Sequence, residues 1–303
     1  MRFWRSPLGA LALVILLAAG GAIGATAYRV FRQTSPPRST EAAIDFESMM
    51  VRAEDVRFPA TDGIELAGWL IRGAPDRAPI VLCHDLGSSK ASLVNVALAL
   101  SRAGFTVLMF DFRAHGGSSG ERSSLGVLEK RDVVGAVDFL AGLEEGLEAK
   151  RIGVFGVGMG AHAAVLAAAD RPVLRVLVLD GLYPDASYAL ARRVYLDWGF
   201  AVNHLAFVSG GMLAALSGST GPEARAADVI GHLPGRDLLL LAPASDTRLA
   251  DEMMRMYQTV PDQADADGNL VVLPATHADG LYASDLTRYH ERVAAFFSSR
   301  LGS

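Results

Sequence analysis

Residues 151–169 read Arg-Ile-Gly-Val-Phe-Gly-Val-Gly-Met-Gly-Ala-His-Ala-Ala-Val-Leu-Ala-Ala-Ala. The apolar run over 151–155 predicts a buried strand, and the small residues that begin at Ala161 predict a helix. The glycines of residues 156–160 lie between them and predict a sharp turn. In some enzymes, a turn of this kind presents a nucleophilic side chain. The middle residue of this turn is Gly158, which has no side chain.

The same glycines fit a second interpretation. Gly156-x-Gly158-x-x-Ala161 matches the dinucleotide-binding pattern in its G-x-G-x-x-A form, and Asp180 follows about twenty residues later, where an acid would hold a ribose hydroxyl. Such a pattern usually belongs to the first β-α-β unit of its domain, whereas several strand and helix patterns precede this one. The choice between the two interpretations therefore depends on the neighbouring motifs.

Predicted strands alternate with predicted helices over the body of the chain, which indicates a mostly parallel sheet covered by helices on both faces. Two hairpin-like strands come first, at 51–58 and 64–71, so we expect a mixed sheet. The alternation stops between residues 181 and 234, a stretch with many aromatic residues. We interpret this stretch as a helical cap insertion over the sheet.

The N-terminal segment predicts a membrane anchor. Residues 8–28 carry no charge, and about twenty apolar residues suffice to cross a bilayer as a helix. A cleaved signal peptide is the alternative, because Ala25-Thr-Ala27 resembles a cleavage site. We therefore divide the chain into a transmembrane anchor or signal peptide at 1–30, a linker at 31–48, and a domain at 49–303. The predicted location is a membrane crossed once; basic residues on both sides leave the orientation open, and an outward-facing domain is preferred.

Composition excludes several classes of protein. The net charge is −5, with no basic block, so nucleic acid is not an expected partner. Cys83 is the only cysteine, which rules out an intrachain disulfide and predicts a buried strand residue. The seven histidines show no metal-binding spacing, so neither a metal nor a cofactor is expected.

Four short motifs, each after a predicted strand, resemble those of the α/β-hydrolase family over about residues 50–300. They are His84-Asp85-Leu86-Gly87, Asp111-Phe-Arg113-Ala-His115-Gly-Gly-Ser118, Ala244-Ser-Asp246 and Pro274-Ala-Thr-His277. The first is similar to the oxyanion turn of the family, and the last two stand where the family places its acid and its histidine. The resemblance implies an α/β-hydrolase fold.

The resemblance also implies roles for single residues. Asp246 and His277 match the acid and the base of a catalytic triad, and Gly158 matches the nucleophilic serine, whose position is therefore vacant. The backbone amides of Leu86 and Met159 match the donors of an oxyanion hole, with His84 and Asp85 beside them. Asp85 stands where the family usually has glycine, and its carboxylate would oppose a developing negative charge. In the second motif, we expect Asp111 and Arg113 to pair and His115 to lie in an exposed turn.

Whether the protein is an enzyme stays open at this point. The first hypothesis is a membrane-anchored α/β-hydrolase-like pseudoenzyme that binds a small apolar or acyl ligand, an aromatic ligand or a protein partner. The second is an active hydrolase or lyase in which His277, oriented by Asp246, acts as a general base without a covalent intermediate. The third is dinucleotide binding through the glycine turn.

Overall fold

The domain is built on one sheet of eight strands in the order β1-β2-β4-β3-β5-β6-β7-β8. The computed structural model describes residues 7–35, 44–143, 151–198, 225–260, 269–273 and 283–301. The strands are β1 (Ala53–Pro59), β2 (Glu65–Ile71), β3 (Ile80–Cys83), β4 (Val107–Phe110), β5 (Ile152–Val157), β6 (Leu174–Asp180), β7 (Asp237–Pro243) and β8 (Leu270–Leu273).

The sheet is mostly parallel, as the alternating pattern predicted. β1 pairs with β2, and β2 with β4, in antiparallel register, while all the pairs from β4 through β3 to β8 are parallel. The central strands are buried on both faces, which explains why they read as continuous apolar runs rather than as alternating patterns. Both antiparallel pairs involve β2, the second strand of the first hairpin.

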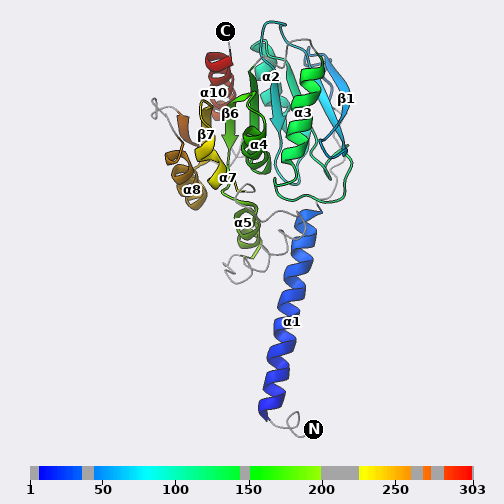
Figure 1. Cartoon of the computed structure of the whole chain (residues 1–303), viewed down its shortest axis with the longest axis vertical. Coiled ribbons are helices and arrows are strands. Elements are labelled where there is room, and N and C mark those ends of the chain that lie inside the picture. Colours follow the sequence, from blue (N-terminus) through cyan, green and yellow to red (C-terminus); the bar gives the residue numbers. More distant parts are fainter. Residues whose placement is uncertain are drawn as a thin grey trace.

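Helices cover both faces of this sheet (Figure 1). Residues of α2 (Val94–Arg102) and α10 (Ala283–Leu301) contribute to the apolar core of one face. Residues of α3 (Lys130–Leu143), α4 (Met159–Asp170), α7 (Ala226–Val229) and α8 (Thr247–Gln258) contribute to the core of the other. The carboxyl ends of the parallel strands therefore meet at one edge of the sheet, where ligands bind in open α/β folds.

The glycine-rich turn lets α4 lie close against the sheet. A Cβ atom at Gly160 would come within 2.2 Å of the Cys83 carbonyl oxygen, and one at Gly156 within 2.6 Å of the Ala161 nitrogen. Two of the three glycines are thus explained by close approach of backbone to backbone. Cys83 is buried at the end of β3, as predicted.

The predicted cap insertion is described in part. Helix α5 (Ala186–Trp198) lies beyond the carboxyl end of β6, on the side of the domain from which α1 extends (Figure 1). Residues 199–224 of the insertion are outside the described residues. The predicted linker at 31–48 and the domain boundaries stay predictions.

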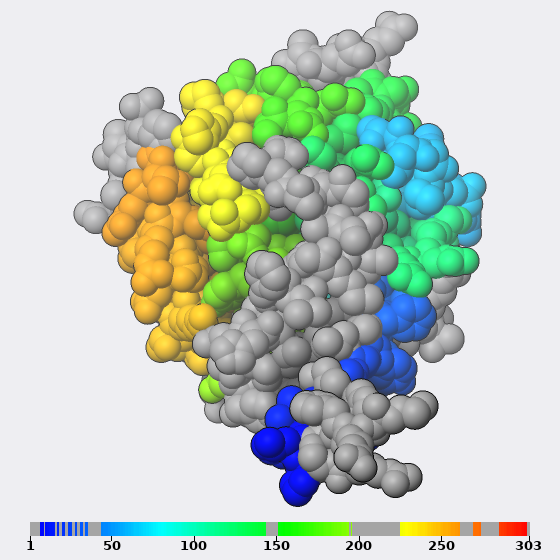
Figure 2. Space-filling view, turned by 60° about the horizontal axis from the view of Figure 1, so that its bottom comes forward, coloured from blue at the N-terminus to red at the C-terminus, as the bar shows by residue number. Residues whose placement is uncertain are grey.

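The N-terminal segment forms α1 (Pro7–Thr34), which extends away from the domain. Its C-terminal end rests on the domain: the Ser123 amide donates to the Thr34 carbonyl at 2.7 Å, and the Arg122 guanidinium lies 4.7 Å from the centre of the Phe31 ring. Figure 2 shows the face from which α1 leaves, with α8 on one side and the β1–β2 hairpin on the other. The predicted transmembrane anchor is not confirmed, since no helix among the described residues is long and apolar enough to cross a bilayer.

Candidate functional site

Four polar or glycine positions meet where parallel strands end. Asp85 follows β3, Gly158 follows β5, Gly181 follows β6 and Asp246 follows β7. Because these strands are parallel neighbours, their carboxyl ends lie along the same edge, and three of the four positions, Asp85, Gly158 and Asp246, belong to the sequence motifs.

Gly158 has a backbone conformation that favours glycine. Its φ is 51° and its ψ is −107°, and it precedes the first residue of α4. A residue with a side chain would be strained in this conformation by about 1–3 kcal/mol. The turn thus retains the sharp geometry predicted from the sequence, with no side chain at its apex.

The carboxylate of Asp85 fills the space beside Gly158. A Cβ atom built on Gly158 would lie 2.2 Å from Asp85 Oδ1 and 2.5 Å from Asp85 Cγ. The same Oδ1 accepts a hydrogen bond of 2.8 Å from the backbone amide of Met159. Asp85 therefore occupies one of the two predicted oxyanion donors, at the N-terminus of α4, where a negative charge is favoured.

Asp246 is held by the cap helix and by its own helix. Arg192 Nε of α5 donates to Asp246 Oδ2 at 2.5 Å, and Asp246 Oδ1 caps α8 by accepting from the Leu249 amide at 3.0 Å. His277 lies outside the described residues, so its pairing with Asp246 stays a prediction. The structure does show that one oxygen of the predicted triad acid is engaged by an arginine.

Two buried histidines hold the turn that carries Asp85. His84 Nε2 accepts from the Phe112 amide at 3.0 Å, while His84 Nδ1 lies 2.7 Å from the Asp85 carbonyl. Burial, with a smaller contribution from the neighbouring His115, lowers the pKa of His84 from 6.5 to about 4. His115 Nε2 accepts from the Gly87 amide at 3.1 Å, and burial lowers its pKa as well. Both rings are therefore neutral at pH 7 and act as fixed spacers.

The expectation that His115 lies in an exposed turn is therefore wrong. Its side chain is 1% exposed, because the loop that contains it folds across the Asp85 turn. His84 is also buried. It supports the Asp85 turn from the protein interior and does not line the pocket.

The expected pair of Asp111 with Arg113 is also wrong. Asp111 accepts from Lys90 Nζ at 2.7 Å, and the Lys90 ammonium lies 4.5 Å from the centre of the Trp69 ring. Arg113 instead lies between two other carboxylates, at 2.6 Å from Asp132 Oδ1 and 2.9 Å from Asp62 Oδ2. Both side chains hold the loop in place, as the hypothesis of a structural role required, but through different partners.

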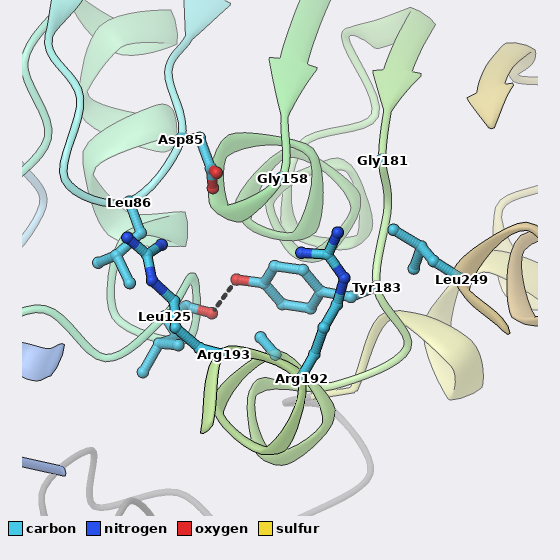
Figure 3. Close-up of a pocket in the computed structure, with 10 residues that line it drawn as sticks. Asp85, Leu86, Leu125, Gly158, Gly181, Tyr183, Arg192, Arg193 and Leu249 are labelled. Atoms are coloured by element: carbon cyan, nitrogen blue, oxygen red, sulfur yellow. Dashed lines mark hydrogen bonds between the residues drawn. The ribbon is translucent and has the colours of Figure 1, made fainter. Parts of the chain in front are cut away.

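A pocket opens between this edge of the sheet and α5 (Figure 3). It is lined by Asp85, Leu86, Leu125, Gly158, Gly181, Tyr183, Ala189, Arg192, Arg193 and Leu249. The Tyr183 hydroxyl donates to the Leu125 carbonyl at 2.7 Å, which fixes its ring among these residues. The two arginines were not predicted as site residues, because the aromatic residues of the insertion indicated a cap and no motif marks its cations.

The part of the chain that the structure describes does not favour a cofactor at the glycine turn. Asp85 occupies the helix N-terminus that a pyrophosphate would use, and Asp180 already accepts a hydrogen bond of 2.7 Å from the Tyr289 hydroxyl. Among the described residues, no group of three or more His, Cys, Asp or Glu side chains is placed to hold a metal ion.

The sheet order, the glycine turn after β5 and the cap helix over the strand ends define an α/β-hydrolase fold, and comparisons with known proteins agree. Residues 74–183 match the family model described as serine aminopeptidase, S33. An esterase from Pyrococcus furiosus, Pf2001, superposes with a TM-score of 0.67 at 23% identity, over 89% of this chain and 100% of its own. The similarity to this solved structure shows the fold.

Two curated bacterial proteins are similar over half of the chain. The uncharacterized protein Rv2307c of Mycobacterium tuberculosis is 30% identical over 153 residues, which is 50% of this chain and 52% of the relative. The uncharacterized protein YfhR of Escherichia coli K12 is 32% identical over 159 residues, or 50% of this chain and 54% of the relative. The chain thus matches about half the length of these relatives.

Proposed function

We propose that this protein is an α/β-hydrolase-family member that has lost serine-dependent hydrolysis and uses its capped pocket to bind a small ligand. The observation that supports this most directly is the position of the Asp85 carboxylate. It leaves no room for the Cβ of a nucleophilic residue 158, which would lie 2.2 Å from Asp85 Oδ1.

Three parts of the expected hydrolytic machinery are either missing or engaged elsewhere. Gly158 supplies no nucleophile, so no acyl-enzyme intermediate can form at this position. The Met159 amide, which would stabilise an oxyanion, already binds Asp85. Asp246, which would orient a histidine, is bound by Arg192.

The changes at Gly158 and Asp85 fit each other. A serine at 158 could not coexist with the present position of Asp85, and without a side chain at 158 the carboxylate has room to reach the Met159 amide. The pair therefore forms a self-consistent inactive arrangement. The general-base alternative depends on His277 and remains a prediction, and no observation favours the dinucleotide alternative.

Three variants are compared with the wild type to test this proposal: Gly158→Ser, Asp85→Gly, and the double variant with both changes. We expect the wild type and both single variants to hydrolyse p-nitrophenyl acetate and butyrate at the rate of a His277→Ala control. The double variant has a nucleophile and a free oxyanion amide, so a stoichiometric burst of p-nitrophenol supports the proposal. Turnover by the wild type that is lost in His277→Ala would instead establish the general-base mechanism.

A further inference from the structure

The guanidinium of Arg193 is the feature of the pocket that the loss of hydrolysis does not explain. Arg192 and Arg193 are consecutive residues of α5, and both line the pocket (Figure 3). Arg192 is neutralised by Asp246. Among the described residues, Arg193 forms no hydrogen bond or ion pair, not even with Asp85 in the same pocket.

Arg193 lies beside the oxyanion turn. Its Nη2 would be 3.8 Å from a Cβ atom at Gly87, so the guanidinium is in contact distance of this turn. The backbone amide of Leu86 in the same turn donates no hydrogen bond to any residue that the structure describes. The Arg193 guanidinium and the turn that carries the Leu86 amide thus line one pocket, and neither donor has an acceptor within the described part of the chain.

The rest of the lining is suited to a hydrocarbon group. Leu125, Tyr183, Ala189 and Leu249 contribute apolar surface around the arginine. A guanidinium binds a carboxylate through two parallel hydrogen bonds, and this geometry is its most specific mode of recognition. A monocarboxylic acid with a short aliphatic or aromatic tail satisfies both the donors and the apolar walls.

We propose that the pocket binds small monocarboxylates, with the carboxylate on Arg193 and the Leu86 amide and the tail against Tyr183, Leu125 and Leu249. This inference rests on the proposed function, since it assigns a ligand class to the same pocket. It also assigns a role to Asp85, whose negative charge lies in the pocket and weakens the binding of an anion. The ligand class is that of the acids which ester hydrolysis releases, so the protein keeps the product-binding chemistry without the reaction.

The experiment titrates the full-length protein with sodium butyrate, hexanoate and benzoate by ligand-observed NMR at constant ionic strength. The matched neutral probes are butyramide, hexanamide and benzamide. We expect at least one carboxylate to bind the wild type at millimolar concentration or below, and its amide to bind at least tenfold more weakly. A hydrogen bond to a charged group contributes about 1.5–3 kcal/mol, so Arg193→Gln should weaken binding of that carboxylate by tenfold or more.

Two further variants separate this role from a general effect on the fold. Arg171→Gln removes an arginine that pairs with Asp138 and does not line the pocket, so it should change carboxylate affinity by less than threefold, while Asp85→Asn removes a negative charge and should raise it several-fold. Equal binding of carboxylate and amide, equal loss in both arginine variants, or no binding of any probe overturns the proposal. Such a result would overturn the proposed ligand class only. The proposed loss of hydrolysis is tested separately by the burst assay described above.

Discussion

Substitution of Gly158 by serine should destabilise the protein in a manner that depends on Asp85. The new Cβ would lie 2.2 Å from Asp85 Oδ1, so the carboxylate must rotate away and lose its 2.8 Å bond to the Met159 amide. Backbone strain at positive φ contributes about 1–3 kcal/mol. The lost charge-assisted bond contributes about 1.5 kcal/mol, toward the lower limit because Asp85 is only half-buried. We therefore expect a loss of about 2.5–4.5 kcal/mol.

The prediction is measured as a double-mutant cycle by urea denaturation. In the Asp85→Gly background there is no carboxylate to displace, so Gly158→Ser should cost about 1.5 kcal/mol less than it does in the wild type. Gly63→Ser is a matched control, because Gly63 also has a positive φ of 84° but no atom within 4 Å of a Cβ. Its cost measures backbone strain alone. An equal cost of Gly158→Ser in both backgrounds refutes the steric argument.

Three further predictions concern the buried polar groups around the site. His162 is fully buried, its ring nitrogens have no hydrogen-bond partner among the described residues, and burial lowers its pKa from 6.5 to about 4. Because the pKa of His162 is lower in the folded state, the stability that this residue contributes is present above pH 6.5 and is lost as the pH falls toward 4. His162→Phe should therefore leave the free energy of unfolding at pH 7 unchanged or higher, and it should remove roughly 3 kcal/mol of the loss between pH 7 and pH 4. Urea titrations at pH 7 and pH 4 measure this, and an unchanged pH dependence contradicts it. Glu129 is fully buried and accepts hydrogen bonds from Ser123, Ser124 and Gly126. Glu129→Gln should therefore lower the free energy of unfolding by about 2–4 kcal/mol in urea titrations. An unchanged free energy of unfolding contradicts the stabilising role of this carboxylate. Asp246→Asn keeps an N-cap acceptor and loses only the partly exposed ion pair with Arg192, whereas Asp246→Ala loses both interactions. Calorimetry should therefore show the alanine variant to be about 1 kcal/mol less stable than the asparagine variant. Equal stabilities of the two variants would exclude the capping role.

The sheet could be predicted because its elements depend on local pattern. The parallel strands are apolar runs that end at motif residues, and β3 and β8 coincide with the short apolar runs at 80–83 and 270–273. The apolar pattern from Leu125 to Leu143 is longer than the helix, which begins at Lys130. Residues 123–126 instead form a turn around the buried Glu129 carboxylate, which accepts from their hydroxyls and amides. Apolar periodicity does not reveal such a polar anchor.

The site was predicted in its positions but not in its contacts. Gly158, Asp85 and Met159 were singled out from their motifs, yet the bond between Asp85 and Met159 joins residues 74 positions apart and depends on the packing of two turns. The two arginines of α5 carry no motif at all. Their position over the strand ends follows from how the cap helix packs, which the sequence pattern of the insertion does not determine.

The central claim is that no nucleophile is available in this pocket. Incubation of the wild-type protein with a fluorophosphonate, followed by intact-mass and peptide mass spectrometry, tests it most directly. We predict no adduct on the wild type and an adduct at residue 158 in the double variant Asp85→Gly, Gly158→Ser. Stoichiometric labelling of the wild-type protein within this domain would contradict the account.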